Sequence, residues 1–291
     1  SLGNSIQISI YGRTMERLNM RLIMACTYLW ISCCLGAQAQ TAVYDQLYSA
    51  LRLDEIVQII KTEGIHEANT TAEIYLKSKG QTGTFRKDIE KLYDRTNIST
   101  FLLDGVANRL TEDDAQSALA FYSGSLGAKI AQLEASARLA ISDDAVESVA
   151  IEIAKAAGSK DHQRYKTLTK NIEDLELVEH NMKGAFASQY GFLTELSQAD
   201  DIDLSQDQIL SMLSANEQKL RGEISAWLIG YSYMAYQPLS DEELDAYLDF
   251  LTSKPGKALH KALFDVFNAL SVETASALGV LIAATREARD L

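Results

Sequence analysis

The chain has 291 residues, a formal net charge of −13 and only two prolines. Its acidic balance argues against nucleic-acid binding, which needs clustered Lys and Arg, and against anionic lipid surfaces. The low proline content and the abundance of Ala, Leu, Glu, Asp and Lys favour long helices over a sheet protein. We therefore expect an all-α protein that binds no nucleic acid.

The pattern of residues 1–39 predicts a non-native leader followed by a secretory signal peptide. Residues 1–14 precede any Met, and either Met15 or Met20 can start the signal. A basic segment with two arginines comes before an apolar core at 22–36 and a small-x-small cleavage site at 37–39. The core is shorter than the about twenty apolar residues of a membrane-spanning helix. We expect cleavage after Ala39, a mature chain that starts at Gln40, and a periplasmic location.

All three cysteines, Cys26, Cys33 and Cys34, lie within this leader. The mature chain would therefore have no disulfide, no thiol nucleophile and no thiolate metal site. An alternative is that Cys33 or Cys34 becomes a lipid-anchored N-terminus. The residues before Cys33 are a poor lipoprotein-type context, so cleavage after Ala39 is the favoured interpretation.

Apolar residues at three-four spacing predict helices along most of the mature chain. In chain order these helices are 44–63, which ends at Gly64, then 71–78, 84–110, 141–157, 162–197 and 204–236. Loops are expected at 80–83 and 200–203, and a boundary at 158–161 divides the chain into units 40–158 and 159–291. No run after the leader is apolar for long enough to span a membrane, so we expect no span in the mature chain.

Residues 110–129 and 239–258 match without gaps at an offset of 129. The identical pairs are Leu110/Leu239, Leu119/Leu248, Phe121/Phe250 and Gly127/Gly256. Such a repeat indicates two related units. We therefore predict two helical-hairpin-centred repeat units that pack as a multi-helix bundle.

Each copy has the residues of a capped helix, a break and a second helix. Thr111 and Ser240 stand at N-cap positions, and an acid follows each three residues later, as in a capping box. The residue before Pro255 is pushed out of the helical region, and Pro255 itself suits the first turn of the next helix. Gly127 and Gly256 would let that second helix approach its partner closely. These are folding residues.

The second copy, Leu239-Ser240-Asp241-Glu242-Glu243-Leu244, then Phe250, then Ser253-Lys254-Pro255-Gly256-Lys257, resembles the core motif of the domain-of-unknown-function 2059 family. The first copy, Leu110–Lys129, is similar to it as well. The resemblance covers about twenty to forty residues per copy. It implies an exported bacterial helical protein without an assigned activity, so it supplies no catalytic residues.

Few side chains are spaced for chemistry. Glu63 and His66 resemble half of a di-iron pair, but no second Glu-x-x-His occurs, so we expect surface side chains. Glu176 and His180, spaced four residues apart, could share a metal with Glu173, but the acidic stretch around them is more simply a solvated face. His162 and His260 have polar or cationic neighbours and are expected to be exposed. We predict no catalytic set, no metal and no cofactor.

Trp227, Tyr231 and Met234 share one helix face and could line a groove for a protein or an apolar small molecule. The alternative interpretation is that they form the core against the repeat hairpin. The leading hypothesis is a non-catalytic envelope protein that binds another envelope protein or an apolar ligand. The alternatives are a periplasmic hydrolase acting on envelope material and a lipoprotein scaffold.

Overall fold

The computed structural model of the chain describes residues 34–76, 83–199, 202 and 204–287, and every regular element in them is an α-helix. In chain order the helices are α1 (Cys34–Ala50), α2 (Leu53–Leu76), α3 (Gly83–Leu92), α4 (Arg95–Ala107), α5 (Glu112–Tyr122), α6 (Ser125–Ala140), α7 (Asp144–Ser159), α8 (Gln163–Asp174), α9 (Leu177–Leu196), α10 (Gln206–Ala215), α11 (Glu217–Tyr236), α12 (Asp241–Thr252) and α13 (Lys254–Glu287). The prediction of an all-α bundle is confirmed.

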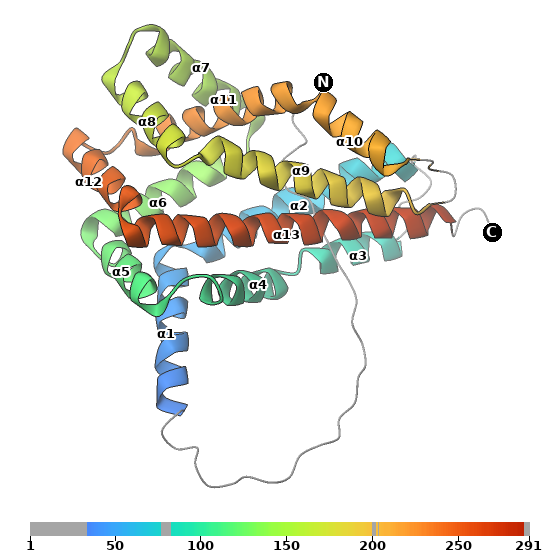
Figure 1. Cartoon of the computed structure of the whole chain (residues 1–291), viewed down its shortest axis with the longest axis horizontal. Helices are drawn as coiled ribbons and strands as arrows, with labels where there is room; N and C mark the ends of the chain where they lie inside the picture. Colours follow the sequence, from blue (N-terminus) through green and yellow to red (C-terminus); the bar gives the residue numbers. More distant parts are fainter. Residues whose placement is uncertain (1–33, 77–82, 200–201, 203, 288–291) are drawn as a thin grey trace.

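The long helix α13 runs through the middle of the molecule with α9 along one side of it (Figure 1). Small residues allow this close packing. A Cβ added to Gly184 would lie 2.1 Å from Asn268 Oδ1, and one added to Gly279 would lie 2.6 Å from the carbonyl oxygen of Phe192. The largest core cluster joins α13 to helices α1–α6 and to α9. The largest cluster therefore includes residues of both predicted units, and their division at 158–161 stays a prediction.

Both repeat segments form a helix–break–helix hairpin, α5–α6 and α12–α13. Thr111 accepts a hydrogen bond from the backbone N–H of Asp114 at 3.2 Å. Ser240 accepts from the N–H of Glu243 at 3.1 Å, and the Glu243 carboxylate accepts from the N–H of Ser240 at 2.9 Å. The predicted caps are thus confirmed, with the reciprocal box complete only at Ser240.

The two glycines of the repeat make matching contacts. A Cβ on Gly127 would lie 2.2 Å from the carbonyl oxygen of Phe121, and one on Gly256 would lie 2.0 Å from that of Phe250. Both breaks are therefore closed against the end of the preceding helix, and only glycine fits. The expectation that the residue before Pro255 stays outside the helix is wrong, because α13 begins at Lys254. Pro255 is the second residue of α13, where its missing N–H costs no helical hydrogen bond.

The two hairpins also pack on one another. The rings of Phe121 and Phe250 stack in parallel with centroids 3.9 Å apart. Lys129 of α6 pairs with Glu243 of α12 at 2.6 Å, and Lys254 of α13 pairs with Asp114 of α5 at 3.1 Å. In each hairpin, the acid three residues after the N-cap thus pairs with a lysine from the second helix of the other hairpin. The descent of the two segments from a duplication stays a prediction.

Several predicted helix boundaries are wrong. The helix expected at 44–63 is broken between α1 and α2, the residues expected as a separate helix from 71 belong to α2, and the helix expected at 84–110 is broken between α3 and α4. α2 continues through Gly64 because the buried Tyr93 ring covers that position, where a Cβ would lie 1.8 Å from ring carbon Cε1. The single helix expected at 162–197 is broken between α8 and α9, where Glu176 takes a left-handed backbone with φ of 50°. The helix expected at 204–236 is broken at Asn216, between α10 and α11.

One expectation about apolar runs is wrong. Residues 254–286 of α13 are long and apolar enough to cross a bilayer, whereas no such run was expected after the leader. In the structure 56% of its most apolar window is buried within the protein. Its packing against α9, α5, α4 and α2 is that of a core helix.

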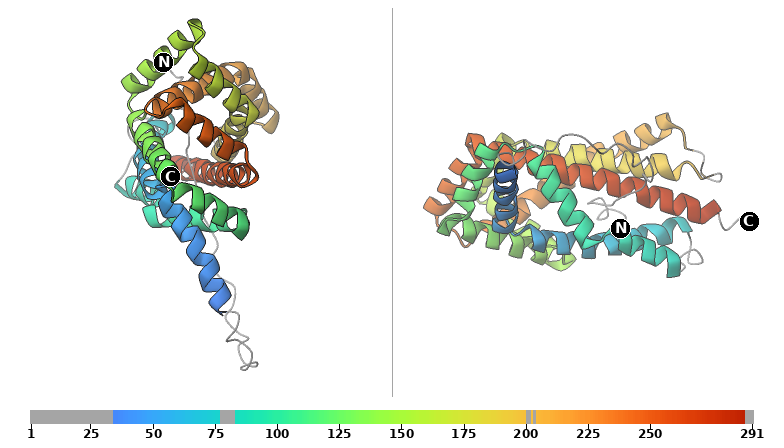
Figure 2. Two further views of the ribbon diagram at one scale, coloured as in Figure 1. Left: turned by 90° about the vertical axis from the view of Figure 1, so that its left-hand side faces the viewer. Right: turned by 90° about the horizontal axis from the view of Figure 1, so that it is seen from below.

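The predicted leader, including Met15, Met20 and Cys33, lies outside the described residues, which begin with α1 at Cys34. The first turns of α1 extend away from the other helices (Figure 2). Val43 and Tyr44 are the first buried side chains of α1 in the described part, and the Tyr44 hydroxyl donates to the Leu110 carbonyl at 2.8 Å. The anchoring contacts of α1 thus follow the predicted cleavage site.

Candidate functional site

The three residues of the predicted groove lie on α11. The rings of Trp227 and Tyr231 stack in parallel, with centroids 5.1 Å apart. Trp227 packs against one core cluster, Tyr231 and Met234 pack against another, and all three are partly buried. The Tyr231 hydroxyl donates to the backbone carbonyl of Glu134 at 3.1 Å. A groove at these residues stays a prediction.

A carboxylate surrounded by tyrosines lies next to them. Glu134 of α6 accepts hydrogen bonds from Tyr236 of α11 at 2.7 Å and from Tyr247 of α12 at 2.6 Å. Burial raises the pKa of Glu134, and the two hydrogen bonds offset part of that rise because they favour the charged form. Burial and the nearby Glu134 charge raise the pKa of both tyrosines.

Glu134 joins three helices. It can hold or release a proton with a shifted pKa, a property that is common at functional sites. Neither cavity described below is lined by it or by its tyrosines. Its two hydrogen bonds link α6 to α11 and α12. Sequence reasoning missed Glu134, although it stands four residues after Ile130 and three before Ala137 on the apolar face of its helix.

One turn further along α6, Arg138 makes a two-pronged ion pair with Glu63 of α2. The Ser142 hydroxyl donates to the same carboxylate at 2.5 Å. Glu63 is thus partly buried in a hydrogen-bonded pair and is not the free surface side chain that was expected, whereas His66 is exposed. Within the described ranges no group of three or more potential metal ligands occurs.

The remaining histidines and acids lie apart from these clusters. Glu173 and Glu176 are exposed, and the His180 ring stacks on Phe264 with centroids 5.1 Å apart. His162 is exposed as expected. The expectation for His260 is wrong because its side chain is partly covered, and burial lowers its pKa to about 4.

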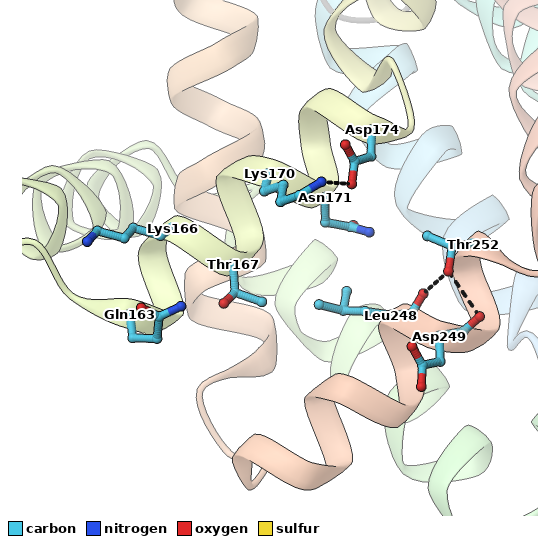
Figure 3. A pocket seen from close by; sticks show the side chains of 9 residues that line it. All are labelled: Gln163, Lys166, Thr167, Lys170, Asn171, Asp174, Leu248, Asp249 and Thr252. Atoms are coloured by element: carbon cyan, nitrogen blue, oxygen red, sulfur yellow. Dashed lines mark hydrogen bonds and ion pairs between the residues drawn. The ribbon is translucent and has the colours of Figure 1, made fainter.

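Two shallow cavities open on the surface. The first, of about 260 Å³, lies between α8 and α12 and is drawn in Figure 3. Its two lysines are neutralised: Lys170 points at Asp174 and pairs with it, and Lys166 pairs with Asp161 at 2.8 Å. Asp249 adds a further negative charge at its wall.

The second cavity, of about 380 Å³, lies along the seam of α9 and α13. Its charged lining residues are Arg109, Lys183, Lys261 and Asp265. The acid pairs with Lys261 at 2.5 Å. Three cations and one acid leave this cavity with a net positive charge.

No family model, no curated protein and no solved structure matches the chain. The resemblance to the domain-of-unknown-function 2059 family stays a prediction.

Proposed function

We propose that this protein is an exported, non-catalytic envelope protein that binds another protein, and that the outer face of α7 is its docking surface. The observation that carries the proposal is the exposure of two large aliphatic side chains on one stripe of that helix. Val149 is 57% exposed and Ile153 is 54% exposed.

The stripe is continuous along α7. Ala145, Val149, Ile153 and Ala156 follow one another at intervals of four, four and three residues, which places them on one helix face, and all are exposed. We call these four residues the α7 stripe. Next to it on the exposed surface runs a polar row that includes Ser148, Glu152 and Lys155. The solvent-facing side of α7 is thus divided lengthwise into an apolar half and a polar half.

The arrangement is the reverse of an ordinary surface helix, which turns its largest apolar residues inward. α7 buries Ala150, Ala154 and Ala157 against the body of the protein. A Cβ on Gly230 of α11 would lie 3.0 Å from Ile151, so the two helices approach closely through small residues. Fold stability therefore does not account for the outward Val149 and Ile153, whereas a partner that covers them does.

The surroundings favour a protein over a membrane as the partner. Asp144 and Glu152 lie on the exposed side of α7, and the chain as a whole is acidic, so anionic lipid headgroups would be repelled. α7 lies at the periphery of the molecule, where a partner helix could be laid along it (Figure 1). An apolar stripe at helical spacing is the kind of surface that a helical partner recognises.

A site-specific photo-crosslinker tests the proposal in the exported compartment of the source cells. Placed at position 153 it should give a discrete crosslinked species, and placed at position 155, on the polar half of the same helix, it should give none. A species of twice the chain mass would identify a second copy as the partner. Equal products at both positions, or none at 153, would refute the docking surface.

A double substitution separates binding from folding. Val149→Ser with Ile153→Ser should leave thermal stability nearly unchanged, since changes at exposed positions usually stay within about 0.5 kcal/mol. The same variant should no longer be captured by the partner that the crosslink identifies. Tyr231→Phe serves as the matched variant for the predicted aromatic groove: loss of capture there, with capture retained in the double variant, would move the docking surface from α7 to α11.

The proposal that the protein is exported rests on the pattern of residues 1–39, and a separate measurement tests it. Mass spectrometry of the mature protein should give Gln40 as the first residue. A lipid-modified Cys33 or Cys34 would make the protein a lipid-anchored one.

A further inference from the structure

The cavity between α9 and α13 has the chemistry of an anion site, and we infer that it binds a small oxyanion with more than one negative charge. The inference concerns a different surface from the α7 stripe. The three cations come from separate elements: Arg109 from the loop between α4 and α5, Lys183 from α9 and Lys261 from α13. The cavity thus gathers cations from three distant parts of the chain.

The charge of this cavity is opposite to that of the chain. The chain has a formal net charge of −13, yet Asp265 is the one acidic residue among those that line the cavity. Lys183 makes no ion pair within the described ranges, and Arg109 makes none either. The first cavity has two lysines as well, but an aspartate neutralises each of them. The uncompensated charge is thus a property of the second cavity and not of surface lysines in general.

The walls hold the polar groups in place. Arg109 Nη1 donates to the Gly105 carbonyl at 3.0 Å, which fixes one side of the guanidinium and leaves its other N–H groups available. Asn268 Nδ2 donates to the His180 carbonyl at 3.2 Å, so the amide bridges α13 and α9.

Small side chains keep the space between the cations open. Gly184, Ala187 and Ala269 line the cavity, and Asn268 Oδ1 occupies the position that a Cβ on Gly184 would take. The part of the wall that α9 supplies is thus two small residues beside Lys183.

The size and the charges together define the ligand class. A volume of about 380 Å³ suits a small molecule and excludes a folded partner. A guanidinium binds carboxylate or phosphate oxygens through paired N–H groups, and an ammonium binds them as a point charge. A polycarboxylate or a phosphate monoester offers enough charged oxygens to meet Arg109 and Lys183 and to share Lys261 with Asp265.

Isothermal titration calorimetry of the full mature chain with citrate and with inorganic phosphate tests the inference. Wild type should bind at least one of the two probes. Lys183→Gln with Lys261→Gln should weaken that binding about tenfold or more, because charge-assisted hydrogen bonds are lost. The matched control is Lys166→Gln with Lys170→Gln, which removes two lysines from the neutralised cavity and should leave affinity unchanged.

The two probes also distinguish the sources of the anion. Binding of citrate alone would identify a polycarboxylate site, and binding of phosphate alone a phosphate site. Failure of wild type to bind either probe would overturn the inference, as would equal weakening in the two double variants. Circular dichroism of both variants should match wild type, since all four lysines are exposed.

Discussion

The repeat glycine at the start of α13 gives the sharpest test of how the hairpins are built. In Gly256→Ala the new Cβ would lie 2.0 Å from the carbonyl oxygen of Phe250. That distance is about 1 Å shorter than the 3.0 Å below which real Cβ atoms essentially never approach another atom. The atom it meets is backbone, so no side-chain rotation relieves the overlap. The break between α12 and α13 must open.

The size of the effect follows from two opposing contributions. Overpacking of this kind costs about 1–3 kcal/mol. Alanine restores up to about 1 kcal/mol because it loses less chain entropy than glycine in a helix. We expect the free energy of unfolding to fall by roughly 1–2 kcal/mol, which lowers the melting temperature by about 2–8 °C in a chain of this size.

Thermal unfolding followed by far-ultraviolet circular dichroism measures this shift, and the chain supplies a control of opposite sign. Gly222 lies in α11, and a Cβ added there meets no described atom within 4 Å. Gly222→Ala should therefore raise stability by about 0.5–1 kcal/mol. Gly127→Ala should behave like Gly256→Ala, since its Cβ would meet the Phe121 carbonyl oxygen at 2.2 Å. If Gly256→Ala and Gly222→Ala shift the melting temperature in the same direction, the argument from the closed break is refuted.

Three further predictions concern pH and the leader. Because burial raises the pKa of Glu134, its contribution to stability is present below the unfolded value of about 4.3 and is lost as pH rises through the folded pKa. Glu134→Gln should therefore flatten the fall of unfolding free energy with rising pH in urea titrations, and an unchanged slope would contradict the burial of this carboxylate. The pKa of His260 is lowered to about 4, so its ring proton signals should titrate near that pH in nuclear magnetic resonance spectra. The stability that the neutral ring contributes is present above about pH 6.5 and should be lost as pH falls toward 4. A midpoint near 6.5 would place the ring in solvent. A chain that starts at Gln40 lacks the first turns of α1 but should keep the melting temperature of the longer chain, because the first described core contacts of α1 begin at Val43. A lower melting temperature would show that the preceding residues support the fold.

Local signals in the sequence were enough to determine the fold class and the repeat hairpins. Capping depends on residues three apart in the chain, so Thr111 and Ser240 could be identified without knowledge of distant contacts. The breaks at Gly127 and Gly256 depend on the preceding helix end, which is also local. These features were predicted and are present.

Long-range packing decided where several helices continue and where they break. Gly64 has the appearance of a helix end, yet the Tyr93 ring, from the turn between α3 and α4, covers it and α2 runs on. The apolar stripe across 162–197 predicted one helix, and the break at Glu176 interrupts it. Helix periodicity cannot report either event, because it records which face is apolar and not which neighbour covers it.

Tertiary structure alone brought the candidate sites together. Glu134 meets Tyr236 and Tyr247 across more than 100 residues of chain, so no sequence spacing could reveal the cluster. The cationic cavity likewise joins Arg109, Lys183 and Lys261 from three separate elements. The exposure of Val149 and Ile153 also depends on the fold, because the sequence alone does not say which face of α7 lies against α11. Short-range chemistry thus determined the helices and their caps, whereas the contacts between distant helices decided which charges and apolar side chains are left for a partner.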